Sequence, residues 1–285
     1  KPVFNPHVNQ WWMCDDGRLL YHVYDKLNRI EYPSIRKDGE LQRSHWRMTL
    51  KEVLRKLKEF PPATVAVVGS GYATNEENFM LQKFAREGLG TEVVAIDDTF
   101  PREDDLVYKR FTIKGEKVPN YQGALDMLQP QETLSGLLKK IDSGEIKALY
   151  FLGGGPDFTL TDEMLNTLKK LDYLVVEDIK YSPLTEIAHV VLAGASAYEK
   201  EGTFTNYQKH VQRIRAAIMP PRAAKTDFEI LHEFFDLLEM PKFLRPKQVF
   251  AEITSTIKEY EEMDFSQLGD WGISQTSAEK AEAAS

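Results

Sequence analysis

The stretch TVAVVGSGYATNEENFMLQKFAREG, residues 64–88, holds the pattern on which the fold depends. Its first seven residues form a short segment that is rich in β-branched residues and apolar on both faces. This is typical of a parallel strand buried inside a sheet. The turn Gly69-Ser70-Gly71 follows, and a helical pattern begins after it. A strand, a glycine turn and a helix in this order are the repeating unit of α/β folds.

Other segments of the chain repeat this alternation. Helical patterns occupy 161–171, about 226–239 and about 246–260, and another begins at Trp46. The sequence therefore predicts an α/β fold in which helices cover both faces of a parallel sheet. The further strand-like segments are 91–97, 146–153, 172–178 and 189–195.

The composition of the chain changes near residue 45, which predicts a division into parts. Residues 1–45 are rich in aromatics, Pro and Gly, with an Asp38-Gly39 turn, and we expect a small β-rich lobe there. Residues 46–240 are predicted to form the α/β domain and 241–275 a C-terminal helical extension. Residues 276–285 have almost nothing apolar to bury, so we predict a disordered tail.

Composition and charge exclude several classes of protein. Of the 285 residues, 42% are hydrophobic and 28% charged, and no apolar run approaches the roughly 20 residues of a membrane helix. The net charge of -8, with acids and bases interleaved, argues against nucleic-acid binding. A single cysteine forms no internal disulfide, which fits the cytoplasm. The start at Lys1, without Met or a signal-peptide pattern, suggests that upstream residues were removed or are missing.

The first glycine turn resembles the start of a dinucleotide-binding unit, but its third glycine is replaced by Thr74. Thr74 and Glu77 form a capping-box pattern, and Glu76 and Glu77 lie at the positive end of the helix dipole. A phosphate there would meet two carboxylates. The sequence therefore favours a tight turn with a helix cap over a phosphate site.

The second glycine loop, 153–155, is ambiguous, because such a backbone can approach a ligand closely or simply reverse direction. Asp162 and Glu163 begin the next helix and weigh against a phosphate. Asp97 and Asp98 end the second strand, where an acid could bind a ribose.

The chain shows no local signature of a catalytic or metal site. No G-x-S-x-G elbow occurs, and no two carboxylates form a recognisable acid–base pair. A Cys–His pair has no local signature either. The histidines have no ligand spacing, so no zinc site held by the protein is expected; they are His7, His22, His45, His189, His210 and His232.

The only cysteine, Cys14, lies in the stretch NQWWMCDDGRLLY, residues 9–21. Two interpretations stay open. Cys14 is a cluster ligand completed by other cysteines, or it is a small, buried, inert side chain, which the lack of a partner cysteine favours.

Several segments, read in order, resemble the molybdopterin oxidoreductase superfamily. WWMCDDGRLLY (11–21) is similar to the segment around the last cluster-binding cysteine of the iron–sulfur domain, and IRKDGELQRSHWRMTLKEVLRKL (35–57) to the stretch that leads into the first α/β domain. Residues 171–212 resemble two strands followed by the signature EGTFTN, here Glu201 to Asn206. The stretches 226–241 and 249–272 resemble the helices that come next.

Within that superfamily the chain looks most like a shortened large iron–sulfur subunit of respiratory complex I. The resemblance implies Cys14 as a fourth [4Fe-4S] ligand. If a pterin is bound, it implies contacts from the second glycine loop and the signature. These residues are Gly153, Gly154, Gly155, Thr203 and Asn206.

The departures from the family pattern remove most of this cofactor apparatus. No other cysteine is present to complete a cluster on this chain, and a second α/β domain expected after 92–98 is replaced by about twenty residues. The C-terminal barrel of the family is also missing from the sequence. In the signature region the pattern's acid is Gln208 and its arginine is His210, and His189 and Ala193 replace Asp and Pro.

The resemblance and the departures together predict a non-catalytic structural or assembly module of an NADH-dependent electron-transfer complex. Its expected partners are subunits that carry flavin and iron–sulfur clusters, and its expected location is the cytoplasm, including the periphery of a membrane complex. No cofactor is expected on this chain alone. The residues Trp12, Gly17 and Arg18 would keep the fold of a former iron–sulfur lobe.

Two alternatives remain. One is a split molybdopterin/[4Fe-4S] oxidoreductase whose missing ligands come from another chain, with a shared cluster on Cys14. The other is a free-standing nucleotide-binding α/β protein. An interface candidate is the aromatic group Trp11, Trp12, Tyr21 and Tyr24, although packing of the lobe on its own neighbour domain explains the group equally well.

Overall fold

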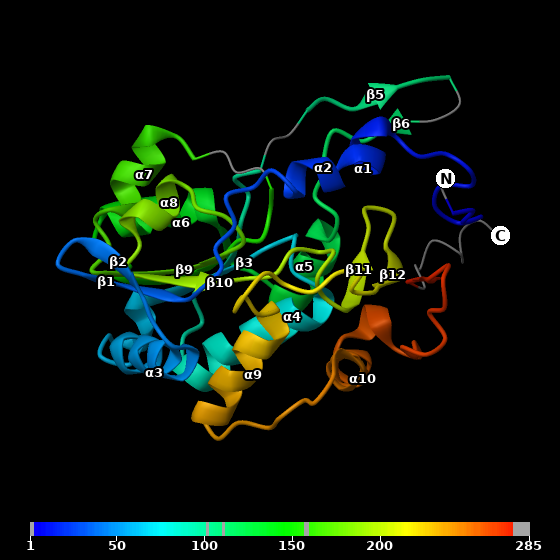
Figure 1. The fold of residues 1–285 in the computed structure, drawn as a ribbon. Coiled ribbons are helices and arrows are strands. Elements are labelled where there is room, and N and C mark those ends of the chain that lie inside the picture. Colours follow the sequence, from blue (N-terminus) through cyan, green and yellow to red (C-terminus); the bar gives the residue numbers. More distant parts are fainter. Residues whose placement is uncertain (1–2, 101–102, 110–111, 157–159, 276–285) are drawn as a thin grey trace.

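The computed structural model describes residues 3–100, 103–109, 112–156 and 160–275. Its centre is an eight-stranded sheet in the order β2-β1-β10-β9-β8-β3-β4-β7 (Figure 1). The strands from β10 to β7 run parallel, and the β1–β2 hairpin is antiparallel. The bounds are β1 Ser34–Lys37, β2 Glu40–Arg43, β3 Val65–Gly69, β4 Val94–Ile96, β7 Glu132–Thr133, β8 Ala148–Leu152, β9 Tyr173–Asp178 and β10 Val190–Ala193.

Helices cover both faces of this sheet, as predicted (Figure 1). Strand β8 shows why: Ala148, Tyr150 and Leu152 belong to one hydrophobic core, and Leu149 and Phe151 belong to the other. The first core also contains α3 Trp46–Leu57, α4 Asn75–Lys83, α5 Tyr121–Leu128, α9 Asp227–Leu237 and α10 Pro246–Thr256. The second contains α6 Leu134–Asp142, α7 Asp162–Leu168 and α8 Pro183–Ile187.

The strands predicted from the sequence are confirmed as β3, β4, β8, β9 and β10. The helix predicted after the first glycine turn differs in one respect. After Lys83 it continues as a π-helical segment, Phe84–Leu89, and it ends at Gly90, whose φ of 74° lies in the left-handed region that glycine tolerates.

The N-terminal segment differs from the β-rich lobe expected there. It contains two short helices, α1 Asp15–Leu19 and α2 Tyr21–Tyr24, and its β1–β2 hairpin extends the large sheet, with Ser34 paired to Val191 of β10. The hairpin covers backbone groups that β10 would otherwise expose as a free sheet edge, a contact that no local pattern reveals. The domain limits drawn from the sequence stay predictions.

A second sheet joins the signature segment to the C-terminal extension. It contains β11 Gly202–Thr205, β12 His210–Ile214 and β13 Ile273–Ser274, with β12 in the middle. A separate ribbon is formed by β5 Leu106–Val107 and β6 Thr112–Ile113, and short 3-10 segments occupy Pro62–Thr64 and Lys258–Tyr260. The tail predicted to be disordered, 276–285, lies outside the described residues. Among the helices described, none has the length and apolar character needed to cross a membrane.

Candidate functional site

The carboxyl ends of β3, β8 and β9 lie side by side at one edge of the large sheet, where parallel-sheet folds bind ligands. This edge brings together the glycine loops 69–71 and 153–155. A Cβ atom on Gly71 would lie 2.3 Å from Val118 Cγ1, and one on Gly155 would lie 2.6 Å from Tyr72 Cε2. The chain's own side chains therefore pack closely against both loops.

The acids at this edge fix the neighbouring backbone. Asp97 Oδ1 accepts hydrogen bonds from the backbone N–H of Thr99 at 2.9 Å and from its hydroxyl at 2.6 Å. Asp178 Oδ1 accepts from the N–H groups of Ile179 and Gly154, at 2.7 and 3.1 Å. Burial raises the pKa of each carboxyl to about 6, against the effect of these hydrogen bonds. Asp97, which the sequence offered as a candidate ribose ligand, thus forms its hydrogen bonds with Thr99 of its own loop.

The start of α4 carries two fully buried glutamates. Thr74 N–H donates to Glu77 at 2.8 Å and Glu77 N–H donates to the Thr74 hydroxyl at 3.1 Å, so the predicted capping box is confirmed. Glu76 accepts from the backbone N–H of Thr203 at 2.8 Å and from its hydroxyl at 3.0 Å. Burial raises the pKa of Glu76 to about 8, so this carboxyl holds a proton at neutral pH.

A buried cluster of charged side chains lies beside α4, and it was not predicted from the sequence. Lys200 is only 2% exposed, and its Nζ lies 2.6 Å from Asp227 Oδ2 and 3.0 Å from Glu77 Oε2. Glu177, at the end of β9, accepts a hydrogen bond from the Tyr150 hydroxyl. These residues come from distant parts of the chain, and the only signal in the sequence is that Lys200 directly precedes the EGTFTN signature.

Thr203 and Asn206, the signature residues predicted to contact a pterin, both bond within the chain. The Thr203 hydroxyl also accepts from Asn75 Nδ2 at 3.0 Å. Asn206 Oδ1 accepts from the backbone N–H groups of Gln208 and His210, at 2.9 and 3.1 Å, and so closes the turn between β11 and β12. The signature therefore fixes a hairpin against the start of α4.

Cys14 is exposed, which corrects the interpretation that it is a buried side chain. Its Sγ accepts from the backbone N–H of Gly17 at 3.3 Å and caps the first turn of α1. Arg18 pairs with Asp15 at 2.6 Å on the surface. A helix cap must lie at the end of its helix, and α1 lies on the surface, so the thiol faces solvent.

His210 and His189 use ring nitrogens in hydrogen bonds within the chain. His210 Nδ1 lies 2.8 Å from Ser274 Oγ, and its Nε2 lies 2.6 Å from the carbonyl oxygen of Trp271. His189 Nδ1 accepts from Leu174 N–H at 3.0 Å. Within the described part of the chain, no three His, Cys, Asp or Glu side chains gather as metal ligands would.

The N-terminal aromatic group divides between surface and core. Trp11 is 67% exposed and Trp12 75% exposed, and Tyr21 is also exposed. Tyr24, in contrast, is buried and lies edge-on to Tyr198, with ring centroids 5.2 Å apart. The interface candidate is thus smaller than the sequence suggested, because Tyr24 packs within the chain.

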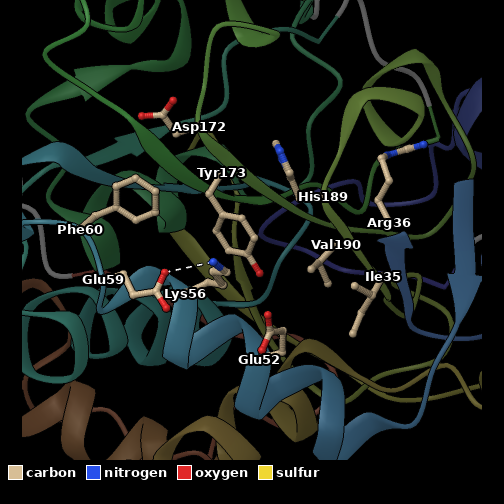
Figure 2. Close-up of a pocket in the computed structure, with 10 residues that line it drawn as sticks. All are labelled: Ile35, Arg36, Glu52, Lys56, Glu59, Phe60, Asp172, Tyr173, His189 and Val190. Atoms are coloured by element: carbon tan, nitrogen blue, oxygen red, sulfur yellow. Dashed lines mark hydrogen bonds and ion pairs between the residues drawn. The ribbon is translucent and has the colours of Figure 1, made fainter. Parts of the chain in front are cut away.

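A cavity of about 240 Å³ lies between α3 and the amino ends of β9 and β10. Figure 2 shows the Tyr173 ring at its centre, with the hydroxyl directed toward Glu52 of α3. That hydroxyl is buried and has no hydrogen-bond partner among the described residues. The lining residues are Ile35, Arg36, Glu52, Lys56, Glu59, Phe60, Asp172, Tyr173, His189 and Val190.

Most charges of this cavity are already paired. Glu52 accepts both a 2.7 Å and a 2.9 Å hydrogen bond from Arg55, and Lys56 bonds to Glu59 at 3.1 Å. Arg36 donates to backbone carbonyl oxygens, including that of Ala188 at 2.8 Å. The cavity also lies at the edge opposite to the one where parallel sheets bind ligands. It is suited to an ordered water on Tyr173 rather than to a substrate.

Comparison with known proteins identifies the family of this chain. A sequence profile of the molybdopterin oxidoreductase family matches residues 29–122 and 116–236, well over half of the chain. The chain belongs to this family. The superfamily resemblance predicted from the sequence is thereby confirmed. The matched residues include the strands and glycine loops of the carboxyl edge.

Curated relatives of this molybdopterin oxidoreductase family member are named as oxidoreductase subunits. The F420-dependent formate dehydrogenase 1 subunit alpha of Methanococcus maripaludis is 32% identical over 134 residues, 45% of this chain and 20% of that protein. The NADPH-Fe(3+) oxidoreductase subunit alpha of Geobacter sulfurreducens is 32% identical over 149 residues, 51% of this chain and 17% of that protein. The chain thus spans about a fifth of the length of these relatives.

A solved structure shares the fold. Acetylene hydratase from Pelobacter acetylenicus aligns with a TM-score of 0.56 over 96% of this chain and 70% of its own, at 10% sequence identity. At that identity the likeness concerns the fold alone.

Proposed function

We propose that this chain is a non-catalytic structural or assembly module of an NADH-dependent electron-transfer complex of the complex I type. Its proposed partners are subunits that carry flavin and iron–sulfur clusters, and its proposed location is the cytoplasm, beside a membrane complex where one is present. Family membership and the names of the relatives, which are subunits of oxidoreductases, support the general class.

The packing of the glycine loops carries the proposal. Val118 and Tyr72 pack closely against Gly71 and Gly155, which supports a carboxyl edge that holds no pterin dinucleotide. The start of α4, where a phosphate would bind, holds two buried glutamates of the chain itself. This edge supports a role as a packed platform rather than as a cofactor cradle.

Metal analysis of the purified chain tests this proposal. We expect substoichiometric molybdenum and iron by plasma mass spectrometry, both in the chain alone and after incubation with the pterin cofactor. Affinity purification of the chain from its native host should recover flavin- and iron–sulfur-carrying subunits. Stoichiometric molybdenum on the purified chain would overturn the proposal.

The exposure of Cys14 favours a second candidate function, a split oxidoreductase that shares a [4Fe-4S] cluster with a companion chain. A ligand supplied to a shared cluster must reach the surface, and Cys14 does. On this hypothesis Cys14→Ser removes the cluster signal from the electron paramagnetic resonance spectrum of the reduced, assembled complex. The neighbouring, exposed Met13 provides the control, since Met13→Ser should leave the signal intact. A signal unchanged in Cys14→Ser excludes the shared cluster.

A further inference from the structure

The carboxyl group of Glu77 lies in a buried pocket of hydrogen-bond donors. Its Oε2 accepts from Thr74 N–H at 2.8 Å and lies 3.0 Å from Lys200 Nζ, and its Oε1 accepts from Phe228 N–H at 3.3 Å. Thr74 caps α4, and Phe228 lies in the first turn of α9. Two helix starts and an ammonium group thus converge on a single carboxylate, which is the donor set that proteins use to bind anions.

The charges around this pocket come from every element packed there. Asp227 of α9 and Glu77 of α4 both contact Lys200, and Glu76 of α4 lies next to Glu77. Burial raises the pKa of Glu76 to about 8, so this carboxyl holds a proton at neutral pH and adds no charge. Burial also raises the pKa of Glu177 and of Glu77, and Lys200 beside Glu77 opposes that rise. The tyrosines that face the cluster are Tyr150 and Tyr24.

Glu177 gives an independent indication that a proton is held in the cluster. It is 1% exposed, and its Oε1 is a buried oxygen with no hydrogen-bond donor among the described residues. Asp227 lies beside it and raises its pKa further. A proton on Glu177 would satisfy this oxygen and leave Lys200 as the one ammonium group between the carboxyl groups of Glu77 and Asp227.

We propose that Glu77 is a built-in anion, which occupies a carboxylate-binding site formed by Lys200 and the starts of α4 and α9. The class of ligand that this site takes is a small carboxylate, and the chain supplies that carboxylate from its own α4. The site is then filled in the folded protein, and the EGTFTN segment that follows Lys200 is held against α4 by it. This inference concerns the isolated chain and stands independently of the proposed function.

Chemical complementation tests the inference. Glu77→Ala removes one methylene group and the carboxylate, together the size of acetate. We expect the variant to have a lower Tm than the wild type at pH 7. At 0.5 M sodium acetate, and for a dissociation constant on the order of 50 mM, its Tm should rise by about 3 °C more than that of the wild type in the same buffer.

Three controls separate site binding from a general salt effect. Acetamide has the size of acetate but no charge, and it should not raise the Tm of Glu77→Ala. Glu77→Gln fills the same volume, so acetate should give it no extra gain. Glu201, an exposed glutamate paired with Arg213, provides the matched site, and Glu201→Ala should show no acetate-specific gain.

Each contrary outcome overturns the inference. Equal gains with acetate and acetamide, an equal gain in Glu77→Gln, or no gain beyond that of the wild type would each show that no carboxylate site opens. A Glu77→Ala variant that folds in neither buffer contradicts the inference as well, since acetate should supply the missing anion. A variant that folds only in acetate supports it.

Discussion

Lys200→Met is expected to lower the free energy of unfolding by about 3 to 5 kcal/mol. The ammonium group of Lys200 is buried and lies within 3.0 Å of carboxylate oxygens of both Glu77 and Asp227. Without it, two carboxylates remain in a site that water does not reach, and each must take up a proton or stay unpaired. Methionine keeps most of the volume of the lysine stem, so the loss reports the charge rather than a cavity.

Urea denaturation at pH 7, followed by far-ultraviolet circular dichroism, measures this effect. The matched control is Lys170→Met, because the Lys170–Asp142 pair is also close, at 2.5 Å, but both side chains are more than half exposed. Its removal should cost less than about 1 kcal/mol. If the two variants lose equal stability, the buried ion pairs of Lys200 with Glu77 and Asp227 contribute no more than an exposed pair does.

Glu76→Gln is expected to remove a large pH dependence from the stability of the protein. The pKa of Glu76 is about 8 in the folded chain, against 4.5 for an ordinary glutamate, because the side chain is fully buried. Between these two pH values the unfolded chain releases a proton that the folded chain keeps. The unfolded state therefore gains stability relative to the folded state as the pH rises from 4.5 to 8, and the wild type becomes less stable.

The difference in unfolding free energy between wild type and Glu76→Gln should therefore change by up to about 5 kcal/mol across this window, in the direction that favours the variant at high pH. Asp97 and Asp178 also have raised pKa values, near 6, but they contribute equally to both proteins and cancel in the difference. Denaturation curves recorded at half-unit steps from pH 5 to 8.5 give the measurement.

The control for this experiment is Glu163→Gln, because Glu163 also lies in the first turn of a helix but is exposed. The unfolding free energy of Glu163→Gln, plotted against pH, should run parallel to that of the wild type. If the unfolding free energies of the wild type and Glu76→Gln change in parallel with pH, Glu76 titrates as an ordinary exposed glutamate. That result would rule out a buried, protonated carboxyl group at Glu76.

Much of the architecture could be predicted because its signals are local. The strand Val65–Gly69 is apolar on both faces, and the capping box of Thr74 and Glu77 spans four consecutive residues. The acids Glu76 and Glu77 could be placed at this helix start, because the positions of charges relative to a helix end follow from the sequence. Family resemblance added the order of the remaining segments.

The environment of individual site residues could not be predicted in the same way. Cys14 is exposed rather than buried, since its exposure depends on where α1 lies. Tyr72 and Val118 were not recognised as the side chains that fill the glycine loops, because they approach Gly155 and Gly71 from other parts of the chain.

The sequence by itself determined the α/β class, the principal strands and helices and membership of the molybdopterin oxidoreductase family, because each depends on periodicity or motifs within short stretches. Only the tertiary structure decided which charges are buried together. Lys200 contacts Glu77 and Asp227 through packing of α4, α9 and the β10–β11 connection. Tertiary contacts also decided that Val118 packs against Gly71 and Tyr72 against Gly155 at the carboxyl edge of the sheet.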